Sequence, residues 1–159
     1  MDVKAQKKSA AMFSQKWQGR GYEKGDTHSF WLELLREVVG MSNVTTKCKF
    51  EYRTSDGGYI DCLIPDCATL IEQKALGTNL DKPELRQGRL VTPFEQALIY
   101  AESLPLPQQP RFIIVCDFGS FRIHDRNNDN VKNNYVAFTL SELESQFHLL
   151  DFLINPENS

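Results

Sequence analysis

The chain has 159 residues, of which 41% are hydrophobic and 25% charged, and its formal net charge is −3. This length suits one domain with a packed core and excludes a fusion of two complete enzymes. The negative charge disfavours a free-standing tight DNA binder, because Lys and Arg supply most of the non-specific affinity for phosphates.

The start of the chain predicts a helix. Ala10, Phe13 and Trp17 recur at helical spacing before Gly19 and Gly21 break the run. Lysines rather than a long apolar stretch precede them, so neither a signal peptide nor a membrane span is expected. We therefore expect a cytoplasmic protein without a membrane partner.

The cysteines and histidines do not predict a zinc site. The four cysteines form no Cys-x-x-Cys pair, and the three histidines are scattered rather than set at ligand spacing. Cys62 and Cys116 lie within apolar runs, which is typical of small buried hydrophobes in a reducing cytoplasm.

A second helix is predicted with Asp26 or Thr27 as its N-cap. Glu33 and Glu37 fall on the margins of its wide apolar face. The residues of that face are Phe30, Trp31, Leu34, Leu35 and Val38.

Two alternating runs, residues 47–53 and 59–64, flank the polar, glycine-bearing segment 54–58 and predict a β-hairpin. Pro65 then interrupts pairing, and residues 69–74 predict a third strand.

Acidic and basic side chains converge on these strands. Glu72 and Lys74 share one face of the third strand with Leu70, because side chains alternate with a period of two. If the second and third strands are neighbours, Asp61 can lie opposite Glu72. Two carboxylates can hold Mg²⁺, or Mn²⁺ with the same oxygen ligands, and a lysine can orient the attacking water in phosphodiester hydrolysis. The alternative is a solvated strand face with an ion pair.

The next predicted helix has a clear N-terminal sequence signature. Thr92, Pro93 and Glu95 form a helix N-terminus with a capping box. Gln96 and Tyr100 lie one turn apart and off the apolar stripe of this helix. The stripe consists of Phe94, Ala97, Leu98, Ala101 and Leu104.

The segment 77–91, before this helix, is predicted to be a loop. It carries Lys82, Arg86 and Arg89, which can contact DNA phosphates if the loop lies beside the site. An ordinary solvated loop is the alternative.

The rest of the chain supplies scaffold. Residues 112–116 are continuously apolar, as in a central strand, and a turn over 117–120 leads to a strand over 121–124. Residues 135–138 predict an edge strand. Thr139 and Glu142 form a second capping box, for a helix that buries Leu140, Leu143, Phe147 and Leu150. Residues 155–159 are typical of a linker, so we expect one domain over 1–154.

The Asp61 to Lys74 segment resembles the metal site of PD-(D/E)XK nucleases, and Gln96 with Tyr100 resembles the accessory motif of RecB-type nucleases. A closer resemblance, from about residue 10 to 153, is to the N-terminal domain of MmeI-type (type IIL) restriction-modification enzymes. The stretches that carry it are residues 16–25, 29–36, 70–74, 80–83, 92–97 and 110–118.

The resemblance implies a restriction-endonuclease-like α/β fold with a mixed central sheet flanked by helices. It implies that Asp61 and Glu72 bind the metal, that Lys74 completes the triad, and that Gln96 and Tyr100 line the cleft. Ten residues separate Asp61 from Glu72, one more than is usual. Related nucleases often add an acid from the first core helix, and Glu33 is our choice for it.

The aspartate itself has an alternative. The family's Pro-Asp pair is here Ile60-Asp61, whereas a literal Pro65-Asp66 lies closer to Glu72. We favour Asp61, because an aspartate after proline is common in tight turns for local hydrogen-bonding reasons.

We therefore predict a Mg²⁺-dependent DNA endonuclease domain that acts on double-stranded DNA. In the resembled enzymes this domain precedes a helical connector, an adenine-specific methyltransferase that uses S-adenosylmethionine, and a target recognition domain, all absent from this chain. The first alternative is a catalytically silent docking or DNA-positioning module of a DNA methyltransferase. A metabolic hydrolase or binding protein with a chance E-x-K triplet is a second.

Overall fold

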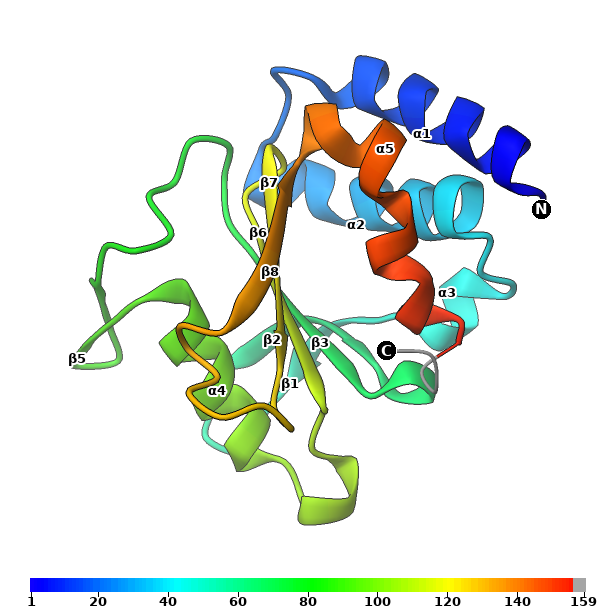
Figure 1. Cartoon of the computed structure of the whole chain (residues 1–159). Coiled ribbons are helices and arrows are strands. Elements are labelled where there is room, and N and C mark those ends of the chain that lie inside the picture. Colours follow the sequence, from blue (N-terminus) through cyan, green and yellow to red (C-terminus); the bar gives the residue numbers. More distant parts are fainter. Residues whose placement is uncertain (156–159) are drawn as a thin grey trace.

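The computed structural model describes residues 1–155, in which a six-stranded mixed sheet has helices on both faces (Figure 1). The strands lie in the order β1-β2-β3-β6-β7-β8. Only β3 and β6 are parallel neighbours, and the other adjacent pairs are antiparallel. The bounds are β1 Lys49–Arg53, β2 Tyr59–Ile64, β3 Thr69–Gln73, β6 Phe112–Cys116, β7 Ser120–Asp125 and β8 Tyr135–Thr139. This confirms the predicted α/β class, a mixed sheet consistent with a restriction-endonuclease-like core.

The burial of the strands follows their place in the sheet. All residues of β3 and β6 are buried, as expected of central strands covered on both faces. Edge strand β1 alternates between exposed and half-buried residues. The side chains of β3 that carry chemistry therefore lie at the middle of the sheet.

The helices divide unequally between the two faces of the sheet. Helix α4 (Pro93–Ser103) covers one face, and the other helices cover the opposite face (Figure 1). These are α1 Val3–Trp17, α2 Glu23–Glu33 with a π-helical continuation over Leu34–Val39, α3 Val44–Lys47 and α5 Leu143–Gln146. Short 3-10 segments, Leu140–Glu142 and Phe147–Leu153, flank α5. In the part of the chain that is described, no helix combines the length and apolarity needed to cross a bilayer.

An aromatic cluster forms the larger core, between the sheet and α1 and α2. The ring of Phe30 packs edge-on against Phe13 and Trp17, with centroid distances of 5.1 and 5.2 Å. Phe118 packs on the same ring at 5.0 Å. Gly21 passes so close to Phe118 that an added Cβ would lie 2.5 Å from the phenylalanine ring, so this position requires glycine.

The smaller core lies under α4. Phe94, Ala97 and Ala101 of the predicted stripe are buried there against Leu70 and Val115 of the sheet. The capping box that starts α4 is confirmed: the Thr92 hydroxyl accepts from the amide of Glu95 at 3.2 Å, and the Glu95 carboxylate accepts from the amide of Thr92 at 2.8 Å. The second predicted box, Thr139 with Glu142, is also present.

Two predictions about local structure were wrong. Helix α2 starts at Glu23, with Asp26 in its first turn instead of at its N-cap, and the Asp26 carboxylate accepts from the amide of Tyr22 at 2.9 Å. The segment predicted as a loop contains a hairpin of β4 (Glu84–Arg86) and β5 (Arg89–Val91). Its residues are exposed except at Val91, so no burial pattern marked the strands. The linker expected over 155–159 lies, beyond residue 155, outside the described residues.

Candidate functional site

The predicted triad lies just beyond the last paired positions of β2 and β3, with Glu72 and Lys74 on the face that α4 covers and Asp61 beside the first turn of α2. The β2–β3 register pairs Cys62 with Ile71, and Asp61 and Glu72 are the next residues along the two strands. Glu72 and Lys74 lie on the same face as Leu70, which is part of the core under α4. The Asp61 carboxylate accepts a hydrogen bond of 2.7 Å from the backbone amide of Gln73, which fixes it beside Glu72.

The backbone changes its pairing at Asp61. The β1–β2 ladder pairs Phe50 with Cys62 and Tyr52 with Ile60, but skips the pair between them, Glu51 and Asp61. Glu51 adopts a left-handed conformation with φ of 51°, which is uncommon for a residue other than glycine. As a result Phe50 packs on the larger core and Tyr52 on the smaller one. Irregular strand geometry of this kind often re-aims side chains at functional sites.

Glu72 and Lys74 form a buried ion pair. The Lys74 Nζ lies 3.2 Å from Glu72 Oε2, and the two side chains are only 10% and 5% exposed. The other carboxylate oxygen, Oε1, is buried and has no hydrogen-bond partner within residues 1–155. A buried carboxylate oxygen without a partner is costly, so Glu72 has an unused acceptor that a ligand could occupy.

Burial perturbs both acids, and repulsion from neighbouring carboxylates adds to its effect. Burial, opposed by the hydrogen bond from the Gln73 amide, raises the pKa of Asp61 to about 6. Burial, followed by repulsion from Asp61, raises the pKa of Glu72 to about 8, against the attraction of Lys74. Raised carboxyl pKa values on neighbouring strands are characteristic of functional sites rather than of surface ion pairs.

Two further acids flank Asp61. A cavity of about 270 Å³ opens beside it, lined by Glu23, Lys24, Thr27, His28, Glu51 and Asp61. Glu23, in the first turn of α2, contributes to the raised pKa of both Asp61 and Glu72. Sequence reasoning chose Glu33 as the acid from this helix, but Glu33 pairs with Lys16 and does not line this cavity.

The alternative aspartate lies elsewhere. Asp66 is exposed in the 3-10 turn Pro65–Cys67, where local hydrogen bonding was expected to place it. It lines a separate cavity together with Met41 and Lys47, beside α3 on the opposite face of the sheet. The structure thus brings Asp61, and not Asp66, to Glu72.

Tyr100, one of the two predicted accessory residues of α4, approaches the same region. Gln96 is buried at 6% exposure, and Tyr100 is half-buried. Burial raises the pKa of the Tyr100 hydroxyl, and repulsion from the Glu72 and Asp61 carboxylates adds to this effect, so the phenol lies within electrostatic range of both. Tyr100 packs on Gly58, where an added Cβ would lie 2.5 Å from the tyrosine ring.

Gln73, the middle residue of the triplet, holds the site together. Its side chain is fully buried and accepts a 2.6 Å hydrogen bond from the indole of Trp31 on α2. Its amide group donates to the carbonyl of Lys74 at 3.0 Å, while its backbone amide binds Asp61. The sequence alone predicted no role for Gln73.

The oxygen donors suit a hard divalent cation. Within residues 1–155 there is no group of three or more His, Cys, Asp and Glu side chains placed to hold a metal ion. Mg²⁺ is commonly bound by one or two carboxylates, with water and substrate phosphate completing its octahedron. The unpartnered Glu72 oxygen and the raised carboxyl pKa values both fit such an ion.

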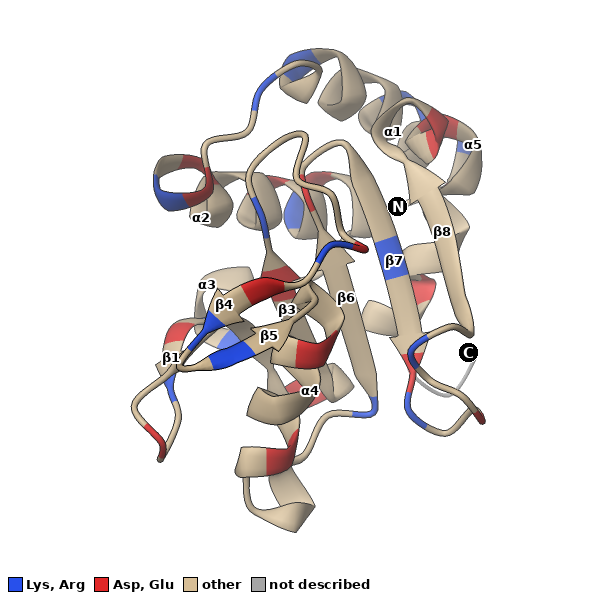
Figure 2. Cartoon of the chain, turned by 90° about the vertical axis from the view of Figure 1, so that its left-hand side faces the viewer, with Lys and Arg blue, Asp and Glu red and all other residues tan. Residues whose placement is uncertain are grey.

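The predicted phosphate-contacting residues are carried by the β4–β5 hairpin and the turn before it. Lys82, Arg86 and Arg89 are exposed, and Arg86 pairs with Glu84 at 2.9 Å. Figure 2, which views the α4 side, shows basic residues on β4, β5 and β7.

Residues 8–158 match the protein family described as MmeI, N-terminal domain, which covers nearly the whole chain. Comparisons with curated proteins and with solved structures gave no significant match.

Proposed function

The chain belongs to the MmeI N-terminal domain family, and from this premise and the site we propose that it is a Mg²⁺-dependent DNA endonuclease domain. MmeI-type enzymes are restriction-modification enzymes, so the family supports a nuclease module in a larger DNA-acting protein. The observation that carries the proposal is the pair Asp61 and Glu72 with Lys74 at 3.2 Å from Glu72. Mn²⁺ is an alternative metal because it accepts the same ligands.

Each residue has a defined task in this proposal. Asp61 and Glu72 would hold the ion, which when bound supplies a Lewis acid for the scissile phosphate. Lys74 would orient the attacking water and stabilise charge on the phosphate. Its ammonium would be available for this role when a bound cation neutralises the Glu72 carboxylate. Gln96 and Tyr100 would shape the cleft along α4.

The remaining acid of the proposal comes from α2. We assign the accessory role to Glu23 in place of Glu33, because Glu23 lines the cavity beside Asp61 and acts on both carboxylates. Glu33 stays a partner of Lys16.

Metal titration tests the proposal. We expect calorimetry to detect Mg²⁺ binding that Glu72→Ala abolishes, and nicking of supercoiled plasmid that both Glu72→Ala and Lys74→Ala abolish. Asp66→Asn serves as a control that should leave both signals unchanged. Absence of metal binding to the wild-type chain would refute the nuclease proposal. Metal binding without nicking would instead favour the silent DNA-positioning module.

A further inference from the structure

One transverse row of the sheet extends from the candidate metal site to an arginine. Glu72 pairs with Val115 of β6, and Val115 pairs with Arg122 of β7. Directly paired residues on neighbouring strands point to the same face, and strands are about 4.8 Å apart, so the Cα atoms of Arg122 and Glu72 are about 10 Å apart. Arg122 therefore projects on the α4 face, within reach of a phosphate next to one bound at Glu72.

Arg122 is held by a carboxylate from the segment after β3. Its guanidinium donates two hydrogen bonds to Asp81, at 2.8 and 3.1 Å. The two partners differ in burial: the Arg122 side chain is 22% exposed, whereas that of Asp81 is 74% exposed. The guanidinium also lies 4.8 Å from the ring centroid of Tyr135, a contact that does not depend on Asp81.

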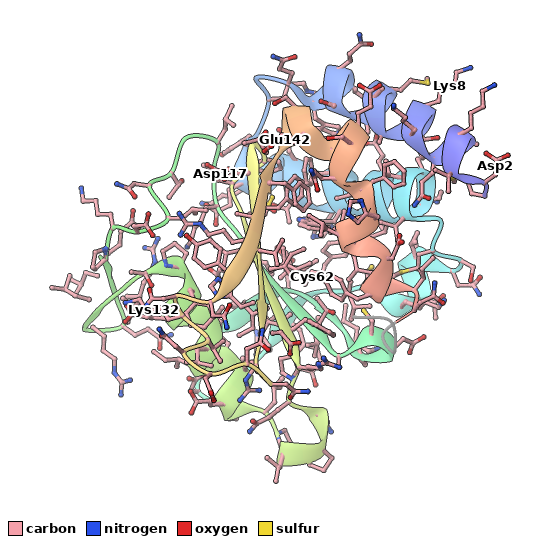
Figure 3. The ribbon with its side chains drawn as sticks, viewed as in Figure 1. Asp2, Lys8, Cys62, Asp117, Lys132 and Glu142 are labelled. Carbon is pink, nitrogen blue, oxygen red and sulfur yellow. The ribbon has the colours of Figure 1, made fainter. Side chains whose placement is uncertain are left out.

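The surroundings of this pair favour an anion. A cavity of about 230 Å³ is lined by Asp81, Arg122 and Lys132 among others. Lys132 lies on the α4 side of the sheet, as Figure 3 shows, and its only carboxylate contact among the described residues is a 3.3 Å pair with Glu95. Arg122 and Lys132 thus line the same cavity, and the exposed Asp81 side chain can move out of it into solvent.

We propose that Arg122 binds a DNA phosphate adjacent to the scissile one, and that Asp81 occupies its guanidinium when DNA is absent. The planar fork of arginine binds carboxylate and phosphate in the same bidentate manner, so the Asp81 carboxylate stands where the phosphate goes. An exposed ion pair is weak, and DNA therefore displaces it readily. This inference rests on the proposed nuclease function, because it assigns a substrate contact to the same face.

Release of Asp81 has a second effect. Asp81 precedes Lys82 and the β4–β5 hairpin, and its pair with Arg122 fastens this segment to β7. Exchange of the carboxylate for a phosphate frees Lys82, Arg86 and Arg89 to follow the same DNA. The segment thus acts as a latch that opposes DNA binding until a phosphate replaces it.

Two variants with opposite expected effects on DNA affinity test the latch. The probe is a fluorescently labelled DNA duplex in EDTA, followed by anisotropy, so that metal binding at Glu72 does not enter. We expect Asp81→Asn to bind at least threefold more tightly than wild type. Arg122→Gln should bind more weakly, by three- to tenfold, with its salt slope reduced by about one. The double variant should bind like Arg122→Gln.

Matched controls separate the latch from general charge effects. Asp66→Asn removes the same charge on the opposite face, and Arg111→Gln breaks the comparable pair with Asp125, 2.9 Å, at the far end of β6. The inference is overturned if Asp81→Asn binds no tighter than Asp66→Asn, or if it weakens binding as Arg122→Gln does, which would make the pair a structural brace. Tight binding by Asp81→Asn without any Mg²⁺-dependent nicking would sustain the latch and refute the hydrolase.

Discussion

The most direct test of the electrostatics is the isosteric change Glu72→Gln, measured as a function of pH without metal. Burial raises the pKa of Glu72 from its ordinary value of 4.5 to about 8. The folded wild type then binds more protons than the unfolded chain between these values, so its stability falls as pH rises through that window and is unaffected well below it. The glutamine variant carries no such proton.

The size of this change in stability follows from the difference between the two pKa values of Glu72. Protonation of a carboxyl with an ordinary pKa of 4.5 costs about 3 kcal/mol at pH 7 and under about 1 kcal/mol at pH 5. The stability of Glu72→Gln relative to wild type should therefore improve by up to about 2 kcal/mol from pH 5 to pH 7. For a chain of this size that is a relative shift in Tm of about 4–8 °C. The loss of the Lys74 partner is a cost common to both pH values, so it drops out of the comparison.

The assay is thermal unfolding by calorimetry or circular dichroism in EDTA at pH 5, 6, 7 and 8. Glu33→Gln is the matched control, since its carboxylate pairs with a half-exposed lysine and should give no comparable pH dependence. Adding Mg²⁺ at pH 8 should raise the Tm of wild type and not that of Glu72→Gln. An ion that binds only the folded protein stabilises the folded state, and the variant lacks the Glu72 carboxylate that would bind it. A stability difference that stays constant from pH 5 to pH 7 would refute the argument.

Three other changes probe the supports of the site. Lys74→Met should abolish nicking while Mg²⁺ binding by calorimetry persists or tightens, because the ammonium no longer competes for Glu72; loss of metal binding would contradict this role. Gln73→Met leaves the Trp31 indole unpaired and should lower the free energy of unfolding by about 1–3 kcal/mol, and adding Trp31→Phe should recover part of it in a double-mutant cycle. Gly58→Ala should cost about 1–3 kcal/mol in denaturant unfolding because its Cβ meets the Tyr100 ring, and an equal cost in a Tyr100→Ala background would show that the contact is not the cause.

Much of the candidate site could be predicted because it depends on local alternation. The period of two along 69–73 fixes which β3 side chains share a face, and the short turn before β2 fixes the hairpin. The same hairpin register could have identified Glu51 as a neighbour of Asp61, since both residues lie between the pairs Phe50–Cys62 and Tyr52–Ile60. The helix cap at Thr92 is likewise encoded within four residues.

What could not be predicted depends on contacts between distant segments. Glu23 reaches the site because α2 begins two residues after Gly21, whose close approach to Phe118 no local pattern reveals. The role of Gln73 requires Trp31, which lies 42 residues earlier. The pair between Asp81 and Arg122 joins positions 41 residues apart and needs the β6–β7 register to exist. Tertiary packing, and not propensity, decides each of these.

In the proposed function, the charges around Asp61 and Glu72 would make metal and DNA binding interdependent. Asp61, and Glu72 once it is ionised, repel an approaching phosphate, and the nearest cation, Lys74, lies 3.2 Å from Glu72. A divalent ion would relieve this repulsion and free Lys74, so DNA should bind more tightly with Mg²⁺ present. By linkage, DNA must then raise the affinity for Mg²⁺ by the same factor. A chain with a net charge of −3 can thus act on a polyanion if its metal and its substrate arrive at one face together.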